Sequence, residues 1–496
     1  MAEEITPTSP TEENGITWAW VGCGLGLLTC GAALSWLSRS FVYGTEMLHR
    51  PIPLLIGLLM LSALVYFAAI HLAKISTPTR KLAYFIFGVG ALMRLLVAPS
   101  LPILEDDYYR YLWDGGVTAQ GVNPYTTIPA DVQARRDSVE APLLQLADDA
   151  GIVLHRVNHP QLGTVYPPVA QVAFAVAHWI APWHLAGLRL LYYGVDCIAF
   201  GLLVLLLRQL KQSPLLSLIY WWNPLLVEEV YNSVHMDILL VPFLLGVVLL
   251  VLQGQIGWSM VPLALATATK LWPVLLVVPV LALIARDKRR LLLTTGIFII
   301  LSGALLSPLL SIRSLGDDSG FLAYGARWEM NDALFMVFPW TISTLSGLLS
   351  FPVDPALAHR GGRLIAAGLV GLVALSMAWR AHRLTQVAGD GSIANWTLEH
   401  RLAWCRGLCW IVAALFLLSP TQFPWYFVWL LPFLTITPNR ALLGLTFVLP
   451  LYYLRFYFDA RDMVDVFHNQ IVWLEFGPIL LWLLFDGYRA RRNPAP

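Results

Sequence analysis

Long apolar segments separated by short polar stretches run along most of the chain. The clearest of them have roughly 17–25 residues, the length that an α-helix needs to cross the hydrocarbon layer of a membrane. They are 17–36, 52–73, 82–100, 187–209, 290–311, 364–380 and 470–487. Together with the shorter apolar runs between them, they predict an all-α, polytopic transmembrane helical bundle with about 11–14 spans.

Two parts of this pattern do not fit complete spans. The sequence Lys270-Leu271-Trp272-Pro273 interrupts an apolar run and predicts two short helices that meet at a polar kink inside the membrane. Between 312 and 402, Arg360 and Arg380 cannot both be cytoplasmic if every apolar segment crosses, so we predict that one segment there is re-entrant or half-length. Broken helices at membrane depth usually line a cavity.

A polar stretch that begins at Glu105 is the best indication of chemistry. Glu105, Asp106 and Asp107 directly follow a membrane-length apolar segment, where ionised side chains are costly unless they are paired or functional. From Asp107, the spacing 107, 110, 111 and 114 places polar residues on one helical face, opposite an aromatic and aliphatic face. We predict a helix in the membrane interface that stops at Gly121, and a second short helix over 137–149.

Composition and charge narrow the class of protein and give an orientation. The chain is 57% hydrophobic and only 13% charged, whereas soluble domains have about 25% charged residues. A net charge of +1 gives no electrostatic basis for a nucleic-acid partner. Basic residues gather in 74–81, 286–290 and 489–492, and the positive-inside rule places these loops in the cytoplasm. The acidic stretch then lies on the extracytoplasmic side.

The residues of this stretch resemble a family signature. Asp106-Asp107-x-x-Arg110-Tyr111-x-Trp113-Asp114-Gly115, followed by Gly121-Val122-Asn123-Pro124-Tyr125, resembles the first-loop signature of bacterial GT-C glycosyltransferases, especially polyprenyl-phosphate-mannose-dependent mannosyltransferases. Shorter landmarks follow in the expected order, namely Tyr166-Pro167-Pro168, Asn223-Pro224 to His235-x-Asp237, Lys270-x-x-Pro273 and Pro424-Trp425-Tyr426.

The resemblance implies an integral protein of a bacterial plasma membrane with its active site on the extracytoplasmic side. It would transfer a hexose, mannose first of all, from a polyprenyl-phosphate donor to an acceptor hydroxyl with inversion. The acceptor would be a glycolipid, a polysaccharide or a protein. The chain would divide into N-terminal transmembrane helices (1–100), an extracytoplasmic catalytic loop (101–165), central transmembrane helices (166–311), a second extracytoplasmic loop (312–332) and C-terminal transmembrane helices (333–496).

Such a transfer needs a carboxylate that takes the proton of the attacking hydroxyl. Glu105, Asp106 and Asp107 are the candidates, and crowding of like charges is expected to raise the pKa of the group towards neutral. Asp106 and Asp107 are the alternatives for the base. We prefer Asp107, which shares a helical face with Arg110, although the same face could lock the two in an ion pair.

The reaction also needs positive charge for the leaving phosphate and a surface that orients the sugar. Donor and phosphate binding is expected from Arg110, Lys270, Arg327, His235 and Asp237, with Arg313 as a further candidate. Positioning of the sugar and the acceptor is expected from Tyr111, Trp113, Asp114, Asn123, Tyr166, Trp425 and Tyr426. Glu228 and Glu229, at the end of an apolar segment, are interpreted as interfacial charges rather than metal ligands.

Two questions stay open at this level. We expect no cofactor, and the alternative is a divalent cation held by oxygen ligands from Glu105, Asp106, Asp107 and Asp237. The alternative function is a transporter or flippase of a lipid-linked saccharide, which the many spans and the intramembrane Lys270 would suit.

Overall fold

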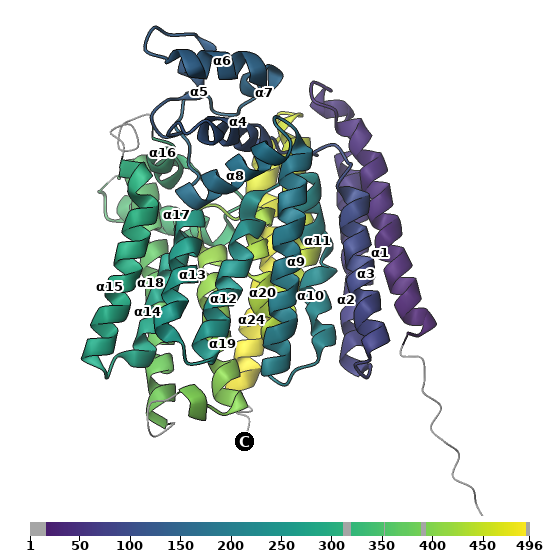
Figure 1. Ribbon diagram of the computed structural model, residues 1–496, viewed down its shortest axis with the longest axis vertical. Coiled ribbons are helices and arrows are strands. Elements are labelled where there is room, and N and C mark those ends of the chain that lie inside the picture. The colour runs from purple at the N-terminus through teal and green to yellow at the C-terminus, as the bar shows by residue number, and fades with distance from the viewer. Residues whose placement is uncertain (1–15, 311–318, 352, 388–392, 493–496) are drawn as a thin grey trace, which may run out of the picture.

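The computed structural model describes residues 16–310, 319–351, 353–387 and 393–492, which form a bundle of upright helices with smaller helices across one end (Figure 1). Arg313 and the first part of the expected loop 312–332 lie outside the described residues. We call the end that carries the small helices the upper end and the opposite end, where the last helix stops, the lower end. The described residues contain no strand, as the all-α prediction requires.

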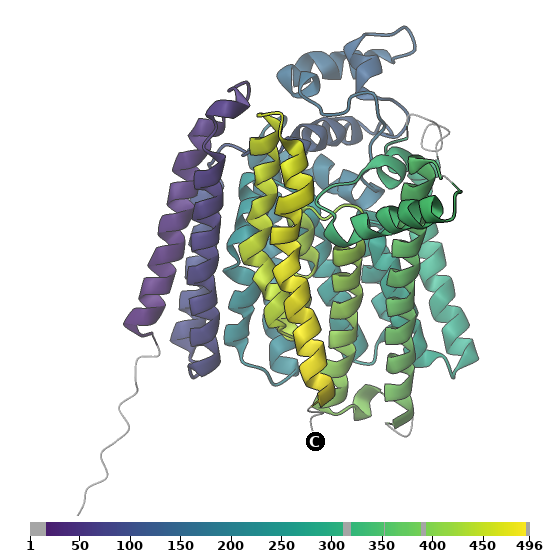
Figure 2. The ribbon, with the colours of Figure 1, turned by 180° about the vertical axis from the view of Figure 1, so that it is seen from behind.

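The first three upright helices stand together at one side of the bundle, coloured purple in Figure 2. They are α1 (Trp18–Leu37), α2 (Ile52–Ile75) and α3 (Arg80–Val97). Inside the membrane, the buried Arg94 joins α3 to the next long helix, because its Nε lies 2.6 Å from Oδ2 of Asp196 and its guanidinium lies over the Trp221 ring. A buried ion pair of this kind fixes the position of one helix along the other. The hydrophobic pattern of the sequence does not indicate this pair.

The central part of the chain runs from α8 (Pro168–Ile180) to α15. Its helices are α9 (Leu185–Gln209), α10 (Leu218–Trp221), α11 (Pro224–Val227), α12 (Val241–Leu252), α13 (Ile256–Thr269), α14 (Val277–Leu281) and α15 (Lys288–Leu306). The C-terminal part contains α16 (Gly320–Arg327), α17 (Ala333–Leu348), α18 (Pro355–Val387), α19 (Leu398–Leu418), α20 (Leu431–Ile436), α21 (Arg440–Val448), α22 (Leu454–Asp459), α23 (Val464–Val466) and α24 (Val472–Arg492).

Length and composition identify the helices that can cross a membrane. Eight helices of the described chain are long and apolar enough, or nine if a pair bent by 108° counts as one span. Four more apolar helices have 10–17 residues: Pro168–Ile180, Ile256–Thr269, Trp272–Ile284 and Ala333–Leu348. The predicted total of about 11–14 spans counted such short segments together with the full-length ones.

Two spans are broken, and both breaks reach the upper half of the bundle. The predicted interruption is confirmed, since α13 ends at Thr269 and a 3-10 turn, η6 (Trp272–Leu276), follows Lys270. The other break lies between η4 (Glu228–Asn232) and η5 (Met236–Leu240), where the chain bends by 108°. Backbone that leaves helical geometry at membrane depth is tolerated where it lines a cavity, and these two breaks bring Lys270 and Asp237 together.

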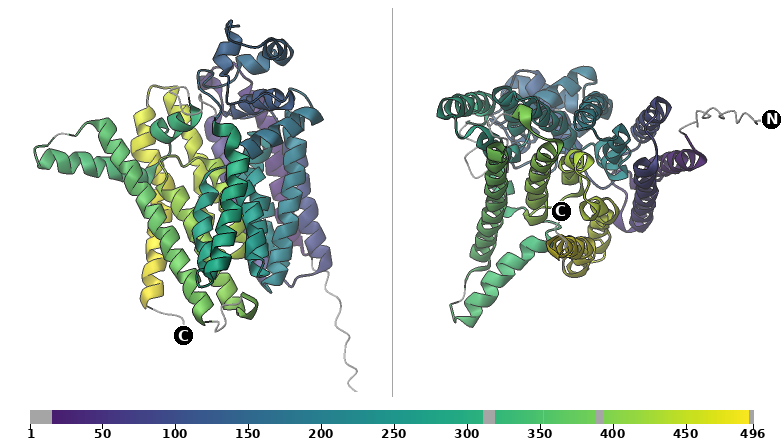
Figure 3. Two further views of the ribbon diagram at one scale, coloured as in Figure 1. Left: turned by 60° about the vertical axis from the view of Figure 1, so that its left-hand side comes forward. Right: turned by 90° about the horizontal axis from the view of Figure 1, so that it is seen from below.

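The structure between 312 and 402 confirms the prediction that one apolar segment there is too short to cross the membrane. The 16-residue α17 lies across the upper end, and it projects outward with the start of α18, as Figure 3 shows on the left. The 33-residue α18 then crosses the bundle alone. Arg360 lies in its second turn and Arg380 near its other end, so the two arginines face opposite sides of the membrane.

The first-loop helix α4 (Asp107–Ala119) begins at the predicted residue and lies across the upper end (Figure 1). Above it lies a cap of three short helices, α5 (Pro129–Gln133), α6 (Ala141–Ala150) and α7 (Ile152–His155). Contrary to the expected half-exposed interfacial helix, every residue from Tyr108 to Val117 is buried. Glycine permits this, because a Cβ at Gly116 would overlap the Trp183 ring.

Glu228 and Glu229 are a second correction. Neither side chain is accessible, and Tyr453 donates a hydrogen bond to Oε2 of Glu228 at 3.2 Å and to Oε1 of Glu229 at 2.9 Å. They are therefore buried polar groups inside the bundle and not interfacial charges. Hydroxyl groups of Ser233 and Tyr453 donate to three of the four carboxylate oxygens, and His235 Nε2 lies 3.5 Å from the fourth, Oε2 of Glu229.

Candidate active site

A cavity of about 820 Å³ is lined in part by the first residues of α4, the helix that lies across the upper end of the bundle. Its walls come from segments that are far apart in the sequence: 104–111, 158–167, 236–237, 269–272, 320–330, 419–429 and 452–456. Two of these segments are the breaks in the spans described above. The cavity is thus built from non-local contacts at the level where the chain leaves the membrane, which is typical of sites for small molecules and lipids.

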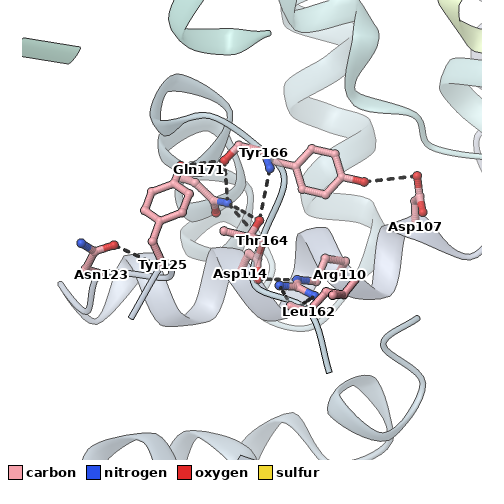
Figure 4. A network of polar contacts seen from close by, with 9 residues as sticks. All are labelled: Asp107, Arg110, Asp114, Asn123, Tyr125, Leu162, Thr164, Tyr166 and Gln171. Atoms are coloured by element: carbon pink, nitrogen blue, oxygen red, sulfur yellow. Dashed lines mark hydrogen bonds and ion pairs between the residues drawn. The ribbon is translucent and has the colours of Figure 1, made fainter. Parts of the chain in front are cut away.

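Asp107 is the one acid of the Glu105–Asp107 group whose two carboxylate oxygens both accept hydrogen bonds in the described structure. Nδ2 of Asn158 donates a hydrogen bond to its Oδ1 at 2.7 Å, and the Tyr166 hydroxyl donates to its Oδ2 at 3.2 Å. Figure 4 shows the Tyr166 ring pointing at Asp107. Asp107 is also the first residue of α4.

Asp106 shares a donor with its neighbour. It is the residue before α4, but its side chain does not cap the helix, and instead its Oδ1 accepts a hydrogen bond from Nδ2 of Asn158 at 3.0 Å. Burial, and then the charge of Asp107, raise the pKa of Asp106 to about 6. Asn158 therefore bridges two adjacent carboxylates and fixes their separation.

Glu105 is the third acid of the group and also lines the cavity. The Tyr452 hydroxyl donates a hydrogen bond to its Oε1 at 3.2 Å. Burial, and then the charges of Asp107 and Asp106, raise the pKa of Glu105 to about 8. The direction agrees with the prediction from crowding, but burial is the larger cause. At neutral pH Glu105 mostly holds its proton and Asp106 mostly does not.

A pH dependence of stability follows from this shift. The pKa of Glu105 is about 8 in the folded protein, above its ordinary value of 4.5, so the folded state binds the proton more tightly than the unfolded state does. Its contribution to stability is complete below about pH 4.5 and is lost as the pH rises through about 8. We expect the thermal unfolding midpoint of Glu105→Gln to fall less steeply over this range than that of the wild type.

Intrinsic fluorescence of the purified chain in detergent measures these midpoints. The control is Glu140→Gln, which changes an exposed acid of the cap and should keep the wild-type slope. Equal slopes for Glu105→Gln and the wild type would contradict the assignment of the raised pKa.

Arg110 is bound to a network behind α4 and not to Asp107. Its Nε lies 3.0 Å from Oδ1 of Asp114, and its two terminal nitrogens donate to the carbonyl oxygen of Leu162 at 3.1 Å each. Gln171 donates to Oδ2 of Asp114 at 3.2 Å and to the carbonyl oxygen of Tyr166 at 3.2 Å (Figure 4). The network fixes the segment that carries Tyr166, and it leaves Asp107 free of an ion pair with Arg110.

The two broken spans place a cation opposite the acidic group. Nζ of Lys270 lies 2.6 Å from Oδ1 of Asp237, and the Trp429 indole nitrogen donates to the same oxygen at 2.5 Å. The ammonium group also lies over the Tyr426 ring, 4.1 Å from its centroid. Lys270 is 22% exposed and Asp237 only 2%, so the lysine is the member of the pair that reaches the cavity.

Aromatic rings and further cations make up the rest of the wall. Trp425 and Tyr426 both line the cavity, and the Tyr426 hydroxyl lies 2.5 Å from the Tyr324 hydroxyl. Arg327 and Arg455 line the same space, and neither forms an ion pair with a carboxylate of the described chain. Positively charged and aromatic side chains thus line the same cavity as the three acids.

The structure brings most of the expected site residues to one cavity. The residues that line it are Glu105, Asp106, Asp107, Arg110, Tyr111, Tyr166, Asp237, Lys270, Arg327, Trp425 and Tyr426. Four others lie outside its lining. His235 is fully buried behind Trp425 with the ring centroids 3.9 Å apart, Trp113 stacks on Trp183, Asp114 pairs with Arg110, and Asn123 accepts a hydrogen bond from the Tyr125 amide. In this structure these four residues can act only through their neighbours.

Sequence reasoning missed several residues of the site. Asn158, Trp429, Tyr452 and Arg455 line the cavity and contact or face the acidic group or the Lys270–Asp237 pair. None of them stands in a recognisable pattern of the sequence. The one indication in the sequence was a group of polar residues near the end of an apolar segment, Tyr452, Tyr453 and Arg455.

The acids do not form a ready metal site. The described residues contain no group of three or more His, Cys, Asp or Glu side chains placed to hold a metal ion. Asp237, one of the four expected oxygen ligands, is already bound to Lys270 and Trp429. In this structure Asp237 therefore interacts with a lysine and an indole.

Comparison with known proteins gives one match. Residues 164–394 match the model of glycosyltransferase family 87, which is fewer than half of the 496 residues. No curated protein and no solved structure matches the chain. The matched part includes Tyr166, Asp237, Lys270 and Arg327 and begins after α4. Together with the eight apolar helices, it supports an integral membrane glycosyltransferase, and it favours transfer over the transporter alternative.

Proposed function

We propose that this membrane glycosyltransferase transfers a hexose, mannose first of all, from a polyprenyl-phosphate donor to an acceptor hydroxyl on the extracytoplasmic side of a bacterial plasma membrane, with inversion. The observation that carries the proposal is the placing of Asp107, whose carboxylate faces a cavity at the membrane boundary and is oriented by Asn158 and Tyr166.

Asp107 is the proposed general base. Arg110 is engaged by Asp114 and Leu162, so the ion pair that would have neutralised Asp107 does not form. The Asn158 and Tyr166 donors hold both oxygens in place, and a carboxylate oxygen retains a further lone pair for the proton of the acceptor. Asp106 is the neighbour that shares Asn158, and Glu105, mostly protonated at neutral pH, is the least suited of the three.

The proposed step is one displacement at the anomeric carbon. The acceptor oxygen forms a bond to that carbon while the bond from the carbon to the phosphate oxygen breaks. The proton of the acceptor hydroxyl passes to Asp107, and the bonding electron pair leaves with the polyprenyl phosphate. Attack from the face opposite the leaving group inverts the configuration of the carbon.

The leaving phosphate gains negative charge in this step, and the cations of the cavity are suited to receive it. Lys270 reaches the cavity from the broken span, while Arg327 and Arg455 line it from α16 and α22. We assign the phosphate to these three side chains, with Lys270 first because its position is fixed by Asp237 at 2.6 Å. Trp425 stacks on His235 and Phe423, and Tyr426 stacks on Trp429, so these two rings would contact the sugar with their edges.

A panel of donors tests this function. The purified full chain in lipid would be given polyprenyl-phosphate mannose, glucose and galactose, with extracted membrane glycolipids as acceptors and with and without a chelator. We expect release of polyprenyl phosphate with one donor sugar. Release that stops when the chelator is added would show that the reaction needs a metal ion. No release with any donor and acceptor would favour the transporter alternative.

Asn158 gives a prediction about positioning. In Asn158→Ala the two carboxylates lose their shared donor, and Asp107 keeps only Tyr166. We expect kcat to fall about tenfold with little change in KM, because a base displaced by a fraction of an ångström loses its alignment with the acceptor. Steady-state kinetics measure both constants.

The matched control for Asn158→Ala is Asn395→Ala, an exposed asparagine far from the cavity lining, which should behave like the wild type. A change confined to KM would contradict a role in orienting the base.

A further inference from the structure

A second cavity, of about 320 Å³, lies at the lower end of the bundle between α14, α18 and α19. It is separate from the cavity of the candidate active site, because the two have no lining residue in common. Its apolar lining consists of Pro279, Met377, Ala381, Leu384, Trp404 and Leu408. A small apolar pocket at this end of the bundle can hold part of a lipid molecule.

Three arginines carry the charge of this pocket. Arg380, Arg383 and Arg406 all line it, and no acidic side chain does. None of them forms an ion pair with a carboxylate of the described chain. A guanidinium group stays charged at every physiological pH, so three positive charges line one pocket that has no acidic side chain among its described lining residues. This arrangement is complementary to an anion.

The position of the pocket relative to the membrane indicates what kind of anion. Leu372 and Leu375, about two turns and about one turn before Arg380 on α18, are 61% and 58% exposed, as expected of side chains that face the hydrocarbon. Trp379 is 58% exposed, and the Arg383 guanidinium lies over its ring at 4.8 Å. An exposed tryptophan next to arginines at the end of an apolar segment marks the interface between headgroups and hydrocarbon. The pocket therefore lies at headgroup level.

We propose that Arg380, Arg383 and Arg406 bind the headgroup phosphate of an anionic phospholipid, whose acyl chains lie along the exposed apolar face of α18. Phosphate oxygens accept the forked hydrogen bonds that guanidinium groups donate. The apolar part of the pocket and the neighbouring leucines cover the glycerol and the upper part of the chains. This site does not depend on the proposed transfer reaction, because it lies at the other end of the bundle.

Native mass spectrometry of the delipidated full chain in detergent tests the site. The probes are dioleoyl phosphatidylglycerol and dioleoyl phosphatidylcholine, titrated separately. For the wild type we expect one site with an affinity for phosphatidylglycerol on the order of tenfold or more above that for phosphatidylcholine. Equal affinities would overturn the proposal.

The variants separate this pocket from general surface charge. Arg406→Gln should weaken phosphatidylglycerol binding about fivefold, and Arg380→Gln/Arg383→Gln/Arg406→Gln should abolish the preference, since one surface arginine contributes about that factor. The matched control is Arg489→Gln/Arg491→Gln/Arg492→Gln, which removes three exposed charges from α24 and should keep the preference. A triple pocket variant that keeps the preference would overturn the proposal.

Competition in the wild type tests the source of the phosphate without any variant. Millimolar inorganic phosphate should leave phosphatidylglycerol bound, and displacement would mean that the pocket binds a free anion. Polyprenyl phosphate should bind no more tightly than phosphatidylglycerol. Much tighter binding would make this a second site for the transfer lipid and would overturn the assignment to a phospholipid.

Discussion

Asp107→Asn is expected to lower kcat about 10³-fold, because the amide cannot accept the proton of the attacking hydroxyl. Asparagine has nearly the same size as aspartate, so the hydrogen bonds with Asn158 and Tyr166 can be kept in part and the start of α4 should stay intact. The expected KM for the donor changes little, since Asp107 is not assigned to the phosphate. Single-turnover transfer in proteoliposomes measures the chemical step.

Two controls make the Asp107→Asn result specific. Asp148→Asn changes an exposed acid of the cap that is paired with Arg135, and it should transfer at the wild-type rate. Asp106→Asn should retain more activity than Asp107→Asn, because Asp106 has only the Asn158 contact. If Asp106→Asn were the more damaging of the two, the base would be Asp106 and the assignment would have to be reversed.

Lys270→Met is expected to cause the second largest loss, about 10²-fold in kcat, because it removes the cation assigned to the leaving phosphate. It should also destabilise the protein by about 3 kcal/mol, since Asp237 is then a buried carboxylate without its cation. The two effects have different origins, so they can be separated by a second substitution.

The double variant Lys270→Met/Asp237→Asn makes that separation. It removes the uncompensated charge and should recover most of the lost thermal stability, while the rate of transfer stays low. Recovery of both stability and rate would contradict the role of Lys270 in binding phosphate, and would leave it only the task of neutralising Asp237. Thermal unfolding and single-turnover transfer, measured on the same preparations, decide between these results.

The local features of the chain could be predicted well from the sequence. The start of α4 at Asp107 and the break at Lys270 are encoded within a few residues, by the switch from apolar to polar positions and by the proline at 273. The short segment between 312 and 402 could be predicted from the arginines alone, because each apolar span moves the chain to the other side.

The rest of the site depends on contacts that no local pattern records. Asn158 reaches Asp107 across 51 residues of sequence, and Tyr452 reaches Glu105 across 347. Glu228 and Glu229 looked interfacial because they end an apolar run, yet both carboxylates are buried in the bundle, where Tyr453 contacts each of them. In a membrane, a polar side chain near an apolar segment can equally mark an interface or a buried network.

The burial of α4 shows the same limit. Its two faces were correctly assigned as polar and apolar, but the polar face is covered as well, because Gln171 of α8 and the Leu162 carbonyl satisfy Asp114 and Arg110. A helix whose polar face finds partners inside the protein has the same hydrophobic pattern as one that faces water.

The central claim is that the cavity transfers a sugar directly from a lipid phosphate in one displacement with Asp107 as base. The most direct test is to follow one reaction of the wild-type protein with the preferred donor, and to determine both the lipid product and the anomeric configuration of the transferred sugar by NMR. The account predicts equal amounts of polyprenyl phosphate and glycosylated acceptor, with the configuration inverted. Retention of configuration, or transfer without release of polyprenyl phosphate, would contradict it.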